Sequence, residues 1–443
     1  MGEAENGGRA ASQLEAGAPL SGYADWNARA IYALAFLSLI SAFNYLDRSI
    51  LGLALPLIKT EMHVSDTVLG LVSGLAFAAF YSLLGLPIAW LADRWNRRNI
   101  IAIGFAFWSV MTALTGLVAN IWQLAATRFL MGAGEACGLA PSNSMLADLF
   151  RRASRPLALA ILGAANSLAF IAFFPVLGWI GELYGWRQMF VAAGIPGTVL
   201  ALIFVLTVKE PVRGAHEDQP QRFEPESLLG TIRFLAGSRA FLLIALGAMF
   251  MGANVYAAST WSAAFLMRVH GLSLAEIASS IGPLRGILGG AGILLGGLLT
   301  DRLGRRDARW RLGVPAIACL LVAPAEALFL LGDTTMLWAT GFALTSLFTL
   351  LHQAPVFAVA MSVAKVRMRA VAISILVLFA SLLGQVIGPL LVGFLNDRLQ
   401  PLVGDIAVRY SLLVIAGCAL AAGLSFWAAM RFLEADIRRT ADT

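Results

Sequence analysis

Long apolar stretches separated by short polar loops run through most of the chain. The hydrocarbon core of a membrane is about 30 Å thick, so a helix needs roughly 20 apolar residues to cross it. On that rule the pattern predicts twelve spans, and therefore an all-α membrane protein. We expect the spans at residues 28–55, 66–92, 98–119, 121–148, 155–181, 188–208, 240–268, 275–300, 312–331, 336–363, 370–396 and 410–432.

Polar segments divide these spans into two groups of six. Residues 209–239 are polar and contain prolines, and we interpret them as a cytoplasmic linker between two helical bundles, residues 28–208 and 240–433. Residues 1–27 are mostly small, polar and mildly acidic, whereas a secretory signal needs a basic start and an apolar core. We expect them and residues 434–443 to form cytoplasmic tails, the first of them disordered.

One part of the linker has a helical pattern. Four apolar residues fall on one helical face, which favours a segment lying along the inner surface of the membrane. A short solvated helix without lipid contact is the alternative. The four residues are Leu228, Leu229, Ile232 and Leu235.

Composition and charge also indicate a protein that lies in lipid. Hydrophobic residues make up 59% of the chain and charged residues 13%, whereas about a quarter of the residues in soluble proteins are charged. Of the 32 Lys and Arg, about 24 fall on the side of the two termini, and this bias predicts cytoplasmic termini. The basic pI near 9.5 then reflects membrane topology, not nucleic-acid binding. We expect a monomer in the inner (plasma) membrane.

The cysteines give no sign of a metal site or a disulfide framework. Cys137, Cys319 and Cys418 are an odd number, lie far apart in apolar runs and have no second metal ligand at a useful spacing. No Gly-rich phosphate-binding motif is present, which argues against direct use of ATP. We therefore expect no metal and no cofactor.

The chain contains an internal repeat. Asp93 and Asp301 begin the matching loops DRWNRR and DRLGRR, each directly after the second span of its half. Three further pairs recur at a similar offset, namely Pro141 with Pro355, Arg155 with Arg369, and Gly178 with Gly393. Two parallel repeats of six helices are the arrangement of major facilitator transporters, in which the substrate path lies between the halves.

The doubled loop resembles the G-x-x-x-D-R-x-G-R-R signature of the major facilitator superfamily. The copy GLLTDRLGRR, from Gly297, matches it fully, whereas AWLADRWNRR, from Ala89, has Ala and Asn where glycines are usual. Together with FNYLDR (43–48) and RFLMGAGEACGLAPSNSMLADLF (128–150), the departing copy resembles the spinster family. Typical patterns at these places in that family are NY-hydrophobic-DR, R-x-x-x-G-x-G-E-A and DR-aromatic-NR. The resemblance is strong over the first half and generic over the second.

The resemblance implies a secondary transporter with the major facilitator fold and alternating access. For the spinster family it implies export of anionic amphiphiles of the sphingolipid or lysophospholipid type, linked to protons, with membrane lipids as surroundings. The organic-anion and sugar-acid symporters of the same superfamily also show NYLDR and an R-x-x-x-G-x-x-E-A pattern, and they are the alternative. A transporter-like sensor would add a soluble signalling domain, and an intramembrane enzyme would need a catalytic constellation at depth. The sequence has neither, and we expect no enzyme.

Few ionisable residues lie inside the predicted spans, and most of them are in the first half. A charge at the bilayer centre costs at least about 2.5 to 3.5 kcal/mol, so each is a candidate functional residue. On the first span, Asn44 and Asp47 can share a face, with Arg48 adjacent. On the fourth span, Arg128 and Glu135 are spaced to lie on one face. We expect the two helices to face each other across a polar site.

This arrangement predicts a linkage between protons and an anion. Asp47 or Glu135, when ionised, would pair with Arg48 or Arg128, and protonation would free the arginine to hold an anionic headgroup such as phosphate. The proton-coupling candidates are thus Asp47 and Glu135. Arg48, Arg128 and Asn44 are the substrate-binding candidates. The alternative is a static ion-pair network that fixes helix packing.

The second half offers three weaker candidates. Arg285, deep in the eighth span, is the best placed of them to bind an anion. Glu326 lies near an outer boundary, where we expect it to reach water. His352 titrates in a useful range, although such a residue is more often a satisfied polar group within a bundle.

The repeated loops predict a cytoplasmic gate. The two aspartates end their helices near several arginines, and ion pairs between them would hold one conformation and break in the other. Positive-inside anchoring explains the arginines but not the repeated aspartates. The gate residues are Asp93, Arg94, Arg97, Arg98, Asp301, Arg302, Arg305 and Arg306.

Overall fold

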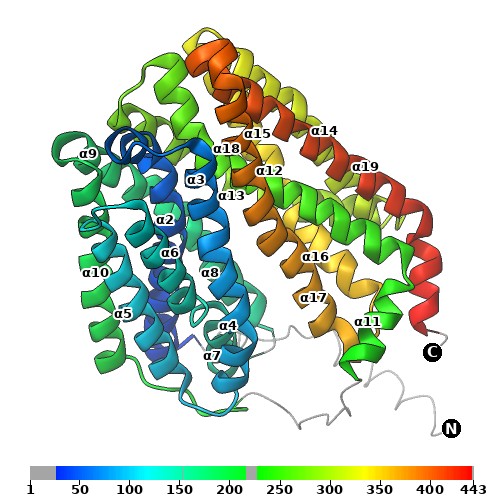
Figure 1. Cartoon of the computed structure of the whole chain (residues 1–443). Helices are drawn as coiled ribbons and strands as arrows, with labels where there is room; N and C mark the ends of the chain where they lie inside the picture. The colour runs from blue at the N-terminus through cyan, green and yellow to red at the C-terminus, as the bar shows by residue number, and fades with distance from the viewer. Residues whose placement is uncertain (1–25, 152, 216–226, 442–443) are drawn as a thin grey trace, which may run out of the picture.

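A computed structural model describes residues 26–151, 153–215 and 227–441, and within them the chain is helical with no strand (Figure 1). The expected N-terminal tail therefore lies almost wholly outside the described residues. The first half comprises α2 (Ala28–Met62), α3 (Asp66–Leu71), η2 (Val72–Ala76), α4 (Phe77–Ala92), α5 (Arg97–Thr115), α6 (Ile121–Glu135), α7 (Leu139–Leu149), α8 (Arg155–Leu168), η3 (Ala169–Phe173), α9 (Phe174–Tyr184) and α10 (Trp186–Thr207).

The linker helix α11 (Leu228–Ala236) precedes the second half. That half comprises α12 (Arg239–His270), α13 (Leu274–Gly304), α14 (Trp310–Leu331), α15 (Thr335–Leu351), α16 (Gln353–Ser362), η4 (Val366–Met368), α17 (Arg369–Val377), η5 (Leu378–Leu383), α18 (Gly384–Val403), η6 (Gly404–Ile406) and α19 (Ala407–Ala441). Figure 1 shows the two halves side by side, with α3 close to α18 at the top of the view.

The helices correspond to the predicted spans. Ten segments of the described residues are long and apolar enough to cross a membrane, and the last of them, Val371–Thr440, contains two predicted spans. The fourth predicted span is present as α6 and α7, each too short to cross alone. The prediction of an all-α membrane protein is confirmed by these helices.

Two predicted spans that were expected to be continuous are broken, at matching places in the two halves. The fourth is interrupted between Glu135 and Leu139, and the tenth at His352. A proline follows each break, Pro141 and Pro355. Because proline lacks an N–H and clashes with the carbonyl four residues before it, it disfavours an uninterrupted helix there. Two of the predicted functional residues therefore lie at helix breaks.

The two halves meet most closely at the end of the molecule opposite the DRWNRR and DRLGRR loops. We call these ends the opposite end and the loop end. A Cβ atom at Gly178 would lie 2.1 Å from Cβ of Ala278 on α13, and one at Gly393 would lie 2.2 Å from the carbonyl oxygen of Asp66 on α3. The glycine pair of the internal repeat thus permits two equivalent close approaches between the halves.

The linker and the C-terminus differ in part from the expectation. In α11, Leu228, Leu229 and Ile232 are exposed, but Leu235 is buried at 1% exposure, so the four do not share one environment. Residues 434–443 were expected to form a tail, whereas α19 continues to Ala441. The first helix also extends beyond its predicted limit, to Met62.

Candidate functional site

A cavity of about 330 Å³ lies between the two halves. Both halves contribute polar side chains to it, and the rest of its lining is largely apolar. Among the described lining residues there are three arginines and one histidine, and no Asp or Glu. The polar and ionisable residues that matter most are Tyr45, Arg48, Arg128, Asn166, Tyr256, Arg285, His352 and Gln385. This central cavity therefore favours a negatively charged ligand.

Arg48 reaches the cavity from α2 and is held by a carboxylate behind it. Its Nε donates to Oε2 of Glu135 over 2.7 Å. Nδ2 of Asn44 donates to the same oxygen over 2.9 Å. Oε1 of Glu135 accepts no hydrogen bond from the described residues. Glu135 and Asn44 do not line the cavity, so the structure places Asn44 as a partner of Glu135 and not as a contact for a ligand.

An aromatic pair, not among the residues predicted from the sequence, supports the two first-half arginines. The Arg48 guanidinium lies 4.6 Å from the ring centroid of Tyr81 and 4.8 Å from that of Phe77. Arg128 lies 5.2 Å from the same Phe77 ring. The sequence signal was FAAFY, which places two aromatic residues one turn apart on the second span. Aromatic faces stabilise cations in desolvated positions.

Asp47 is buried at 1% exposure and has no ion-pair partner among the described residues. Arg128 is turned toward it, but Nη1 of Arg128 donates to the backbone oxygen of Asp47, at 3.4 Å, and not to the carboxylate. Oδ1 of Asp47 and Nε of Arg128 both have no hydrogen-bond partner in the described structure. The expected residues of α2 and α6 therefore come together. The ion pair between Arg48 and Glu135 is formed, and the one between Arg128 and Asp47 is not.

The second-half candidates occupy two places. Arg285 and His352 line the central cavity, and Nδ1 of His352 lies 2.6 Å from the carbonyl oxygen of Thr349. Glu326 was expected to reach water, but this is wrong, because it is 5% exposed. Both of its carboxylate oxygens accept from Nδ2 of Asn254, at 2.9 and 2.8 Å.

A polar cluster that no sequence motif predicts closes the opposite end. Asp66, fully buried at the start of α3, accepts from Arg268 of α12 at 2.6 Å and from Lys59 of α2 at 2.9 Å. In the reverse direction, the carboxylate of Asp397 on α18 accepts from the backbone N–H groups of Asp66 and Thr67, at 2.9 and 2.8 Å. Each half thus supplies one carboxylate to the other. No sequence pattern predicts this pairing, because the partners from the two halves are over 200 positions apart.

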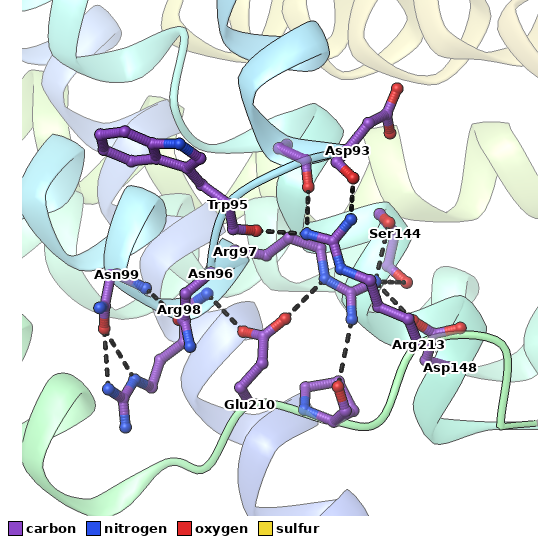
Figure 2. A network of polar contacts seen from close by, with 12 residues as sticks. Asp93, Trp95, Asn96, Arg97, Arg98, Asn99, Ser144, Asp148, Glu210 and Arg213 are labelled. Carbon is purple, nitrogen blue, oxygen red and sulfur yellow. Dashed lines mark hydrogen bonds and ion pairs between the residues drawn. The ribbon is translucent and has the colours of Figure 1, made fainter.

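At the loop end, Arg97 makes ion pairs with a residue of the first half and with the beginning of the linker (Figure 2). Its Nη1 lies 2.5 Å from Asp148 at the end of α7, and its Nε lies 2.8 Å from Glu210 just after α10. Arg97 is 2% exposed. Arg97 thus forms no ion pair with Asp93 in this conformation, and it ties the start of α5 to the end of α7 and to the beginning of the linker. The backbone N–H of Arg98 also donates to Glu210, at 2.8 Å.

The remaining predicted gate residues are exposed. The Asp93 carboxylate forms no ion pair among the described residues, although the Asp93 backbone oxygen accepts from Arg213, as Figure 2 shows. Arg94 stacks on the Trp90 ring at 3.9 Å. The second loop likewise forms no ion pair within the described residues. Its four exposed residues are Asp301, Arg302, Arg305 and Arg306.

Comparison with known proteins agrees with this geometry. A family model of the Major Facilitator Superfamily matches residues 37–389, which is most of the chain. The chain belongs to the major facilitator superfamily. Within it the chain is spinster-like: protein spinster homolog 1 of Homo sapiens is 30% identical over 440 residues, covering 93% of this chain and 82% of the human protein.

Other relatives are transporters as well. An MFS-type efflux pump of Mycolicibacterium smegmatis is 32% identical over 92% of this chain and 94% of the pump. The probable galactarate/D-glucarate transporter GudP of Bacillus subtilis is 29% identical over 65% of this chain and 68% of its own length. The crystal structure of a bacterial homolog to the human lysosomal transporter Spinster, inward-facing and unoccupied, has a TM-score of 0.79. It is 27% identical and is matched over 93% of this chain and 98% of its own. This major facilitator protein is therefore an integral membrane transporter, not an enzyme.

Proposed function

We propose that this transporter exports an amphiphilic anion of the sphingolipid or lysophospholipid type by alternating access, coupled to protons. The observation that carries the proposal is the lining of the central cavity, which has three arginines, one histidine and no acidic side chain among the described residues. A phosphate or carboxylate headgroup needs such donors, because a buried anion is stable only when it is paired.

The apolar part of the cavity supports an amphiphile. Beside the arginines lie side chains such as Phe170, Met251, Val255, Ile293 and Phe357. A small polyhydroxylated acid would place its hydroxyl groups against these apolar side chains. An acyl or sphingoid chain would instead cover the side chains with apolar surface. The resemblance of the motifs to the spinster family implies a cargo of this kind.

We assign proton coupling to Glu135 and Asp47. Glu135 shares Arg48 with the cavity, so a proton on Glu135 would release the guanidinium toward an anion. Asp47 lies behind the cavity and has no cation partner, and burial of that kind favours the neutral acid. Exchange of a proton between these two carboxyl groups and the cytoplasm or the exterior would link pH to anion binding.

The orientation belongs to the same proposal. We place the loop end and both termini in the cytoplasm, because most Lys and Arg fall on that side. The polar cluster around Asp66 then closes the outer side, and Asp93 and Asp301, which form no ion pair within the described residues, leave the cytoplasmic gate open. Ion pairs of these aspartates would form in the alternate state, which is open to the exterior.

A symporter of sugar acids or other small organic anions is the second candidate, because the Bacillus subtilis relative is named as a galactarate/D-glucarate transporter. Both candidates need the same arginines, but only the lipid uses the apolar lining.

Transport in proteoliposomes separates the two candidates. Wild-type protein would be given a panel of lysophospholipids and sphingoid phosphates and, in parallel, galactarate and glucarate, with and without a pH gradient. We expect lipid transport that Arg285→Gln weakens and that the variant Arg438→Gln, at an exposed arginine outside the cavity and the gate, leaves unchanged. Transport of the sugar acids alone would overturn the lipid assignment, and transport of neither class by folded protein would overturn the anion assignment.

A further inference from the structure

A small second cavity lies inside the second half, beside the central one. Its volume is about 50 Å³, which is enough for a cation and about one water molecule, since a water in the liquid takes about 30 Å³. Glu326 lines it from α14, Asn254 from α12, and Thr345 and Thr349 from α15. We call it the Glu326 cavity.

The carboxylate in this cavity lacks a counter-ion. No Lys, Arg or His nitrogen of the described residues lies within 4 Å of Glu326, and its partner is the neutral amide of Asn254. A carboxylate buried to this degree is stable only when a proton or a bound cation neutralises it. The protein must therefore supply one or the other in the membrane interior.

Several oxygen atoms that line the cavity with Glu326 have no hydrogen-bond partner among the described residues. Oδ1 of Asn254, Oγ1 of Thr345 and Oγ1 of Thr349 are buried and have no hydrogen-bond partner among the described residues. Asn254 is 1% exposed and Thr345 is 8% exposed. Neighbouring hydroxyl groups behave differently, since Ser346 donates to the carbonyl oxygen of Phe342 one turn before it. Buried polar atoms normally have hydrogen-bond partners. Three buried oxygens without a partner beside one carboxylate therefore indicate that the cavity binds a ligand.

Oxygen ligands of this kind suit a small hard cation. Carboxylate, amide and hydroxyl oxygens are the donors that such ions prefer in proteins. In other membrane transporters, sites between helices hold Na⁺ or a proton. We propose that the Glu326 cavity is a second coupling site, which takes up one small monovalent cation, either Na⁺ or a proton.

The site can communicate with the central cavity through Arg285. This arginine lines both cavities, forms no ion pair among the described residues, and lies 5.0 Å from the Phe170 ring of the first half. An empty, ionised Glu326 would attract the guanidinium away from the central cavity, whereas a neutralised Glu326 would leave it there. A cation should therefore raise the affinity for an anion, and the anion should raise the affinity for the cation by the same factor.

Few other charged or titratable groups face Glu326. Arg285 lies on α13, and Cys418 of α19 is close enough to interact with it electrostatically. From α12 and α15 the facing groups are the amide of Asn254 and the hydroxyls of Thr345, Ser346 and Thr349. Glu326 is thus the single acidic side chain among the described residues that line this cavity.

Cation binding can be measured without any transported substrate. Purified full-length protein in detergent would be melted in NaCl and in KCl of equal ionic strength, each in acidic and alkaline buffer, for wild type and Glu326→Gln. The matched control is Glu434→Gln, which changes an exposed carboxylate. We expect the wild type and the control to respond to Na⁺ or to pH, and Glu326→Gln to lose that response.

Thr345→Val and Thr349→Val distinguish the two cations, because valine keeps the shape and removes the oxygen. For Na⁺ we expect each to weaken binding by about 10- to 100-fold, the range seen when partners around a metal ion are changed. For a proton we expect the pH response to survive in both. Either result supports the site, and an unchanged response of Glu326→Gln to both ions and pH would overturn it.

A second variant covers the case in which Glu326→Gln fails to fold. Asn254→Asp adds a carboxyl group beside Glu326 and should increase the dependence of stability on the same cation. If the stability of Asn254→Asp depended on the cation no more than that of the wild type, the proposal would be contradicted. The link to Arg285 rests on the proposed anion transport, but the binding measurement does not. Cation binding without transport of any anion would therefore refute the proposed function and leave the Glu326 cavity standing.

Discussion

Arg48 and Glu135 form the one ion pair between α2 and α6 in the described residues, with 2.7 Å between Nε and Oε2. The pair separates two environments, because Arg48 lines the central cavity whereas Glu135 is buried behind it. A change of charge on Glu135 therefore alters the cavity by way of one group, the Arg48 guanidinium, which is either paired with Glu135 or available to a ligand.

Glu135→Gln should abolish the pH dependence of transport. The amide cannot change its charge, so Arg48 would remain available to the anion at every pH. We expect exchange of bound substrate to persist while uptake driven by a pH gradient is lost. Rates in proteoliposomes over a series of pH values provide the measurement, with Glu434→Gln as the exposed control. A pH profile equal to that of the wild type would exclude Glu135 as the coupling residue.

Asp47→Asn should impair proton-coupled transport while leaving the stability of the folded protein nearly unchanged. Asp47 is buried and has no ion-pair partner among the described residues. A neutral side chain of the same size then removes no ion pair, and we expect stability to change by less than about 1 kcal/mol. Gradient-driven transport should nevertheless fall. Melting of the purified protein and transport, measured on the same preparation, test this. A large loss of stability would instead indicate a static structural role for Asp47.

Arg97→Gln should destabilise the loop end of the first half. Arg97 is 2% exposed and bridges the carboxylates of Asp148 and Glu210. Removing one member of a buried ion pair typically costs about 3 to 5 kcal/mol, because the remaining charges lose their partner. We expect a lower melting temperature. Arg94→Gln is the control, since Arg94 is an exposed arginine of the same loop, and equal melting of the two variants would refute the bridge.

Asp66→Asn should open the opposite end. Its carboxylate is shared by Lys59 and Arg268, so its loss leaves two cations close together with reduced compensation. We expect the population to shift toward a state in which the end of α2 and the start of α3 are further from α18. Spin labels on Thr60→Cys and Gln400→Cys, in a background without the native cysteines, would report a longer distance.

The control for that measurement is Glu61→Gln. Glu61 pairs with Arg187 at the same end, but both residues belong to the first half. Breaking this pair should leave the distance between the labels unchanged. An unchanged distance in Asp66→Asn as well would show that the cluster does not hold the halves together.

The sequence alone determined the helices, their approximate limits and the division into two repeats. Length and apolar composition suffice for this, because a helix in lipid satisfies its own backbone hydrogen bonds and can be recognised one span at a time. The motifs also selected the residues of α2 and α6, since ionisable groups inside a membrane are rare enough to stand out.

The tertiary structure decided which partner each ionisable side chain has and how deeply it is buried. The sequence offered Arg97 as one of several partners for the loop aspartates and put Glu326 in reach of water. In this conformation Arg97 pairs with Asp148 and Glu210, and Glu326 is buried against Asn254. It also joins Asp66 to Arg268, 202 positions away along the chain. Such pairs depend on how helices tilt, break and pack, and the spacing along one helix carries no information about the side chains that the next helix presents. The sequence therefore determined which charges enter the membrane, and the packing of the two halves decided which of them are neutralised, which face the cavity and which remain without a partner.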